Sequence, residues 1–381
     1  MVEGSAAFPL TWPLVPLSPK GKRIAGVQGW SVCPLTYRHA CMKWPRPPTP
    51  QPPMNRIITT VVLALAAADA AAQDHKLADI LLDGEGWELV SAGHQFTEGP
   101  APDAAGNVYF TDVRAGRIHK IDAATGKASL WKENTERTNG LMFDAAGRLL
   151  GCQAGRNRII AMDPAGAETE LAAGDWTPND LVVAHNGVYF TAPDKDPAKS
   201  RVYFLPTGGK PAVIEQNIPR PNGIMLSPDG GTLFVADTMN FVVWTYVVKS
   251  DGSVHGRAPY ARLRGARPQM VTAPETRTDA DGKKVTVQKF VRTVVRPENE
   301  RSGADGMTVD RAGRLYVTST AGLQVFDPTG REVGLIAPPA GKKLSNVAFG
   351  GPKFDTLYVT AGDSVYRRKT RTAGFVYPGS K

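Results

Sequence analysis

The stretch PNGIMLSPDGGTLFVAD at residues 221–237 contains a polar residue, a short apolar run, a turn and a second apolar run, in that order. Its polar residue is Asn222, and the Asn-Gly pair that begins there favours a tight bend. The two apolar runs, residues 224–226 and 233–236, predict a pair of β-strands. The Pro-Asp-Gly-Gly run between them is typical of the turn that joins such strands.

The same order of polar residue, strand, turn and strand occurs six times in the chain. The intervals between successive leading polar residues are 41, 40, 43, 83 and 41 residues. A period near 40 residues with several short strands per period is typical of a β-propeller. A β-sandwich with coincidental turns is the alternative, but sandwiches do not usually keep so constant a period. The leading polar residues, which we call the anchor residues, are Glu98, Asn139, Asn179, Asn222, Asp305 and Asn346.

The long interval between Asn222 and Asp305 leaves room for a seventh blade. However, residues 264–302 lack the repeated order and are rich in Arg, Lys, Pro and Asp, although residues 285–295 contain alternating β-type residues. We therefore expect an insertion at 264–302, such as a hairpin over one face, in a ring of six blades and not seven.

The last repeat predicts strands at 346–349, 356–360 and 364–367, but no fourth strand follows them. A strand-like stretch at 87–91 precedes the first repeat and belongs to none of the repeats. We expect this stretch to complete the last blade, because that would remove an exposed sheet edge and join the two ends of the ring. The predicted fold is an all-β, six-bladed β-propeller over residues 73–381, closed by an N-terminal strand.

The residues before the propeller have a different character. Residues 1–53 hold 11 of the 31 prolines and no periodic pattern, so we expect them to be disordered. Residues 54–72 contain a short basic start, an apolar run and an Ala-x-Ala ending, which together predict a secretory signal peptide. This segment is too short to anchor the protein in a membrane. We expect translation to start at Met54, with 1–53 a mis-assigned extension, and the mature protein to be secreted or periplasmic.

The formal net charge of +9 does not indicate a nucleic-acid partner. Residues 1–72 hold seven Lys or Arg against two acidic residues, and the rest of the chain holds 38 against 34. No basic run or stripe appears in the repeats, so a nucleic-acid role is unsupported.

Cysteine and histidine usage excludes several classes of site. Cys152 is the one cysteine in the repeats, so neither a disulfide framework nor a cysteine zinc site can form there. We expect it to be a small core residue. The six histidines show no HExxH or paired spacing, and we interpret His119 and His185 as structural. The chain also lacks a GxSxG elbow, a P-loop and a dinucleotide-binding fingerprint.

The anchor residues should meet at one end of the propeller's central channel, because the innermost strand of every blade runs along that channel. Asn and Asp also favour the turn before a strand, and for Asn139 and Asn346 this explanation and a functional one are equally compatible. Glu98 is not a turn former, so its position indicates function. The positions of Asp305 and Asn222 also favour a functional role over a turn-forming one.

Two carboxylates and four amide side chains that converge in this way would form a site of hard oxygen ligands. Such a site prefers Ca²⁺, with Mg²⁺ or Mn²⁺ as substitutes. Zinc is disfavoured, because the anchor residues include no His or Cys.

Short motifs lie at or near the anchor residues. They are Glu98-Gly99-Pro100, Asn139-Gly140-Leu141, Pro178-Asn179-Asp180-Leu181, Pro221-Asn222-Gly223, Asp305-Gly306-Met307 and Phe349-Gly350-Gly351. With these motifs the chain resembles the gluconolactonase/regucalcin-like family, over residues 87–370. The resemblance implies a six-bladed propeller with one catalytic divalent metal ion on its axis, and a reaction that hydrolyses a sugar lactone.

The same resemblance implies roles for individual residues. Glu98, Asn222 and Asp305 are implied as metal ligands, and Asn179 as a further ligand or a substrate contact. Asp305 is also implied as the general base that takes a proton from the attacking water. Asn139 would orient hydroxyl groups of the substrate, and the metal ion would polarise the lactone carbonyl.

We therefore expect a hydrolase that opens a sugar lactone such as gluconolactone, with the lactone as its small-molecule partner. Two other classes stay open. One is a hydrolase of phosphotriesters or larger lactones on the same metal site. The other is a non-catalytic extracellular propeller that binds a sugar or a protein and uses the metal only structurally.

Overall fold

The structure is a computed structural model, and it describes residues 76–265, 270–278, 283–292, 301–339 and 342–375. The predicted disordered segment and signal peptide lie outside these residues. The described chain contains 26 β-strands and two single-turn 3-10 helices, which are η1 (Leu77–Asp79) and η2 (Pro197–Lys199). Among the described residues no helix has the length and apolar character needed to cross a membrane.

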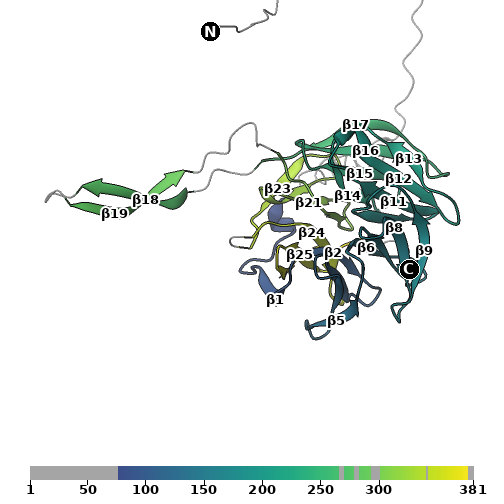
Figure 1. Cartoon of the computed structure of the whole chain (residues 1–381), viewed down its shortest axis with the longest axis horizontal. Coiled ribbons are helices and arrows are strands. Elements are labelled where there is room, and N and C mark those ends of the chain that lie inside the picture. The colour runs from purple at the N-terminus through teal and green to yellow at the C-terminus, as the bar shows by residue number, and fades with distance from the viewer. Residues whose placement is uncertain (1–75, 266–269, 279–282, 293–300, 340–341, 376–381) are drawn as a thin grey trace, which may run out of the picture. The chain divides into compact units, whose positions relative to one another are not determined.

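Six four-stranded antiparallel sheets form the blades of a β-propeller (Figure 1). Each blade's innermost strand contacts the innermost strands of the blades before and after it, so the sheets form a closed ring. The predicted all-β fold with six blades is confirmed. From the first blade to the sixth, the innermost strands are β2 (Thr97–Pro102), β6 (Thr138–Phe143), β10 (Leu181–Ala184), β14 (Pro221–Leu226), β20 (Met307–Val309) and β24 (Asn346–Gly350).

Within each blade the chain moves outward from the channel, one strand at a time. The second strands are β3 (Val108–Asp112), β7 (Leu149–Gln153), β11 (Gly187–Ala192), β15 (Thr232–Asp237), β21 (Leu315–Ser319) and β25 (Thr356–Ala361). The third strands are β4 (Arg117–Ile121), β8 (Arg158–Met162), β12 (Arg201–Pro206), β16 (Val242–Val248), β22 (Gly322–Phe326) and β26 (Ser364–Lys369). The outermost strands are β5 (Ala128–Glu133), β9 (Glu168–Ala173), β13 (Ala212–Glu215), β17 (Val254–Arg262), β23 (Glu332–Ile336) and β1 (Glu88–Ala92).

Aspartate side chains stabilise the turns between the strands. In the first blade Asp103 Oδ1 accepts the backbone N–H groups of Ala105 and Asn107, at 3.0 and 2.9 Å. Aspartate favours such turns because its carboxylate can bind the backbone two residues further on. The same contact recurs at Asp144, Asp163, Asp310 and Asp327.

The sixth blade is closed by the N-terminal strand, as predicted. Strand β1 pairs with β26 in antiparallel register. The closure extends further than the sequence indicates, because Ile80 is fully buried and Leu81 forms an isolated bridge with Thr370. The Arg371 N–H also donates to the Ile80 carbonyl oxygen at 2.8 Å.

The insertion contains a separate two-stranded sheet of β18 (Met270–Thr278) and β19 (Lys284–Arg292). These strands pair in antiparallel register from Met270↔Arg292 to Thr278↔Lys284. The predicted hairpin is therefore confirmed, and the seventh blade is excluded. Whether the hairpin covers one face stays a prediction.

The hydrophobic core lies between neighbouring blades. Every residue of β3 and β11 is buried, because both faces of these strands are covered. Ile118, Leu149 and Met162 pack in one cluster that joins the first two blades. Cys152 is fully buried in the next cluster, as expected of a small core residue.

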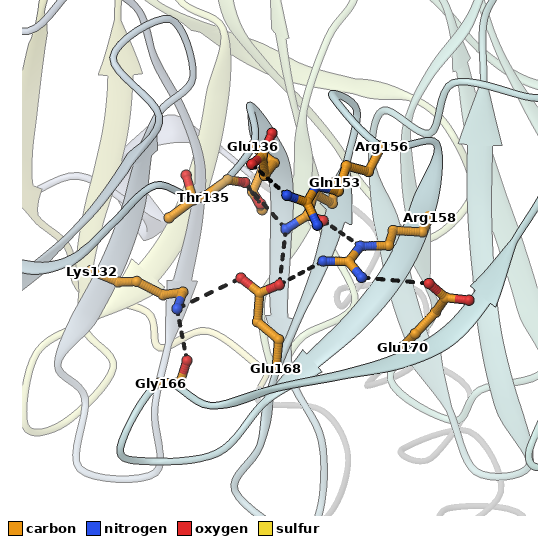
Figure 2. A network of polar contacts seen from close by, with 10 residues as sticks. Lys132, Thr135, Glu136, Gln153, Arg156, Arg158, Gly166, Glu168 and Glu170 are labelled. Carbon is orange, nitrogen blue, oxygen red and sulfur yellow. Dashed lines mark hydrogen bonds and ion pairs between the residues drawn. The ribbon is translucent and has the colours of Figure 1, made fainter.

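Polar contacts join the outer parts of the first two blades (Figure 2). Lys132, at the outer edge of the first blade, donates to the Gly166 carbonyl oxygen at 2.8 Å and lies 3.6 Å from the Glu168 carboxylate. Glu168 also accepts from Arg158 at 2.7 Å. These groups are only partly exposed, so the network fixes the position of one blade against the next.

Candidate metal centre in the central channel

All six anchor residues lie at one end of the channel. Each occupies the first or second position of an innermost strand, or stands two residues before one. Since these strands start at the same end of the ring, their first residues face a common space. The residues, from the first blade to the sixth, are Glu98, Asn139, Asn179, Asn222, Asp305 and Asn346.

Amide side chains join three of the blades directly. Asn139 Nδ2 donates to Asn179 Oδ1 at 2.6 Å, and Asn179 Nδ2 donates to Asn222 Oδ1. These two contacts bring the anchor residues of blades two, three and four into a continuous row. Each amide oxygen has two lone pairs, so an oxygen in this row can still bind a further group.

Asp180 is the site residue that the sequence analysis missed. Its carboxylate Oδ2 accepts from Asn346 Nδ2 at 3.4 Å, which joins the third blade to the sixth. In four other blades the residue after the anchor residue is glycine, and Asp180 stands in that place. An acid at a position that glycine holds in four of the other five blades is the signal that would have identified it.

Glu98 and Asp180 are buried and Asp305 is partly buried, and the three carboxylates of the channel act on one another. Burial, and then repulsion from Asp305 and Asp180, raises the pKa of Glu98 well above its usual range. Burial raises the pKa of Asp180 to about 7. Burial and the Asp180 charge raise the pKa of Asp305 to about 7, although Lys343 and Arg220 oppose this shift.

These carboxylates fit a divalent cation. None of the three is ion-paired with a Lys or Arg in the described part of the chain. Burying several carboxylates without a counter-charge is costly, and a bound cation removes that cost. Cys152 lies close enough to Asp180 for its pKa to be raised by burial and by that charge, so the thiol stays neutral and the donors are oxygens. Hard oxygen donors suit Ca²⁺, Mg²⁺ or Mn²⁺.

Strand irregularities direct the anchor side chains into the channel. The register of the innermost strand shifts between Glu98 and Ala101 in the first blade. The corresponding shifts in the second and fourth blades span Asn139 and Asn222. A β-bulge of this kind changes the direction of a side chain. Gly99, with φ +47°, completes the first bulge, and a Cβ there would collide with the Asn139 carbonyl oxygen. Glycine is required at this position by the close approach of the next blade.

Threonines of the second strands hold the backbone beside the anchor residues. Thr111 Oγ1 donates to the Asn139 carbonyl oxygen at 3.1 Å, and Thr191 Oγ1 donates to the Asn222 carbonyl oxygen at 2.7 Å. Each bond crosses from one blade to the next. Contacts between neighbouring blades therefore hold the backbone beside Asn139 and Asn222 in position.

An apolar cavity of about 50 Å³ adjoins Asp180. Its wall includes Asp180 and Asn346 together with Leu141, Met225 and Phe375. Apolar walls on this side keep water from Asp180, which agrees with the raised pKa of its carboxyl group.

Comparison with known proteins identifies the family. The family model described as the SMP-30/gluconolactonase/LRE-like region matches residues 96–363. The chain belongs to this family. The match covers all six anchor residues, begins after the closing strand β1 and ends before β26.

Individual relatives agree with this assignment. The chain is 26% identical over 320 residues to a gluconolactonase of Zymomonas mobilis, covering 75% of this chain and 82% of that protein. It is 28% identical over 280 residues to a pentonolactonase of Haloferax volcanii, covering 71% and 83%. A solved gluconolactonase structure from Xanthomonas campestris superposes with a TM-score of 0.62 at 26% identity, covering 77% of this chain and 92% of that one.

Proposed function

We propose that this protein is a metal-dependent hydrolase that opens a sugar lactone. The observation that carries the proposal is a group of three carboxylates, two buried and one partly buried, beside a row of amide side chains. None of the three forms an ion pair with a Lys or Arg that the structure describes. Relatives named gluconolactonase and pentonolactonase support the substrate class. Glu98, Asn179, Asn222 and Asp305 would hold the metal ion, for which Ca²⁺ is the first candidate.

The chain's own residues would supply the remaining chemistry. The bound cation would polarise the lactone carbonyl. Asp305, kept ionised by that positive charge, accepts a proton from the water that attacks the carbonyl carbon. The bond from that carbon to the ring oxygen then breaks, and Asp305 returns its proton to the ring oxygen, which leaves as a hydroxyl. Asn139 orients a substrate hydroxyl, and Asp180 holds Asn346 in place.

Acid release from gluconolactone in a pH-stat tests the proposal. We expect calcium-dependent release of one acid per lactone, and loss of the enzymatic rate after chelation. Glu98→Gln removes one of the few charges in the site, and ligand charge sets calcium affinity. This variant should therefore need at least about tenfold more calcium for half-maximal rate.

Glu133→Gln is the matched control, because Glu133 lies on the outermost strand of the same blade and is half exposed. It should leave the calcium requirement unchanged. A wild-type protein that opens no lactone at any calcium concentration contradicts the proposal. Phosphotriester hydrolysis in the same assay format would then favour a phosphotriester hydrolase on the same metal site. Calcium binding without turnover of any substrate would favour the non-catalytic propeller.

We also propose that the mature protein is exported, on the strength of the signal-like segment at residues 54–72. N-terminal sequencing of the protein from the medium or the periplasm should find a start near Gln73. A mature chain that retains residues before Met54 would show that both the start site and the signal peptide are wrongly assigned.

A further inference from the structure

Two histidines and an aspartate meet where the chain passes from the closing blade into the first blade. His94 lies in the loop between β1 and β2, Asp112 ends β3 and His119 lies in β4. Each residue offers one ligand atom, and these three atoms lie within 4.8 Å of one another. The group is separate from the channel site, and the proposed lactone hydrolysis makes no use of it.

The geometry of His94 is that of a metal ligand. Its Nδ1 lies 3.7 Å from Asp112 Oδ2, which is too long for a hydrogen bond. Two ligand atoms around a tetrahedral zinc ion stand about 3.4 Å apart, given bonds of about 2.0–2.1 Å. His94 Nε2 lies 2.7 Å from Ser91 Oγ. When Nε2 donates its proton to Ser91, the Nδ1 lone pair faces the carboxylate, and a cation between them stabilises that arrangement.

Asp112 is held in position by the same loop. Its carboxylate accepts the Gln95 N–H at 3.0 and 3.2 Å and the Phe96 N–H at 3.0 Å. A carboxylate has about four lone-pair sites, so three accepted contacts leave room for a metal ion. The backbone contacts fix the direction of that remaining site.

His119 supplies the second nitrogen. Its Nε2 is buried and has no hydrogen-bond partner in the described structure. A buried nitrogen without a partner destabilises the fold unless something binds it. The ring stacks on Phe110 with centroids 5.2 Å apart, and it meets the edge of His94 at 4.7 Å. Burial lowers the pKa of both histidines, which favours the neutral form that binds metals.

We propose that His94, Asp112 and His119 form a second metal site, which binds a transition-metal ion such as Zn²⁺. Imidazole nitrogens prefer zinc and its neighbours in the first transition series, whereas the oxygen donors of the channel prefer calcium. The backbone N–H of His94 donates to the backbone carbonyl oxygen of Asp363, in the closing blade, at 3.1 Å. An ion here therefore cross-links the junction between the last blade and the first, and its role is structural.

Metal titration of the untagged full-length protein tests this site. Glu98→Gln is used as the background, so that the weakened channel site contributes little. We expect one Co²⁺ per chain with visible absorption bands typical of nitrogen ligation. Zn²⁺ at about 100 times its Kd should raise the Tm by roughly 5 °C.

Three substitutions in that background separate metal binding from packing. His119→Phe keeps an aromatic ring against Phe110 but removes the nitrogen, so the cobalt bands and the zinc-dependent rise in Tm should both disappear. Ser91→Ala should weaken zinc binding about 10- to 100-fold, as expected for a group that orients a ligand. His185→Gln, at an exposed histidine, should change neither readout.

Two results would overturn the second site. The first is a Tm of the Glu98→Gln protein that does not respond to zinc. The second is a His119→Phe protein that keeps the full zinc response. In either case the two histidines only pack against Phe110, as the sequence analysis expects for His119.

Discussion

Replacing Asp305 by asparagine is expected to lower kcat for gluconolactone by a factor of about 10² to 10⁴ at saturating calcium, the usual cost of losing a general base. The amide keeps an oxygen of nearly the same shape in the channel, so the ring and part of the metal affinity should remain. The rate is measured in the pH-stat, and metal content is measured on the same samples. Without that measurement, loss of the base and loss of the ion give the same result.

Asn139→Ala is the comparison variant for this experiment. Asn139 touches Asn179 through one hydrogen bond and carries no charge, so we expect it to affect substrate binding more than chemistry. Its substitution should raise KM more than it lowers kcat. An Asp305→Asn protein that is loaded with metal and retains the wild-type kcat would show that Asp305 is only a ligand. The proton of the water would then pass to another group.

The period of about 40 residues is enough to predict the ring, because each blade repeats the same turn chemistry. The aspartates that begin the turns are local requirements, and local requirements are visible in a sequence. The same reasoning predicts that the anchor residues meet at one end of the channel. Their contacts agree with it, while their roles in metal and substrate binding stay predictions.

Contacts between distant segments are much harder to predict. Asp180 follows an anchor residue in the sequence, yet its partner Asn346 comes from the opposite side of the ring. His94 and His119 are 25 residues apart, with no spacing that indicates a metal site. Only the pairing of β3 with β4, and the loop that enters the first blade, bring them together with Asp112. Such groupings depend on the packing of whole blades.

Ile80→Ala is expected to destabilise the whole propeller by about 2–5 kcal/mol, the usual cost of truncating a buried isoleucine. Ile80 is fully buried and packs in a cluster with Leu323, Leu357 and Val359, which come from the fifth and sixth blades. Its truncation leaves a cavity beside the closing strand. The Tm should fall by roughly 5–15 °C, and thermal or urea unfolding measures the change. Deleting residues 73–91 should have a larger effect, because it also removes most of β1.

Two point variants on β1 show which contact carries the closure. Leu89 is 53% exposed, so Leu89→Ala should change the free energy of unfolding little. Glu88 forms an ion pair with Arg367 at 2.8 Å, but its side chain is 64% exposed, and water screens such a pair. Glu88→Gln should therefore also have a small effect. If Ile80→Ala unfolds at the wild-type temperature while Glu88→Gln does not, the ion pair and not the buried side chain closes the ring. If neither variant nor the deletion lowers the Tm, the propeller is stable without its N-terminal strand.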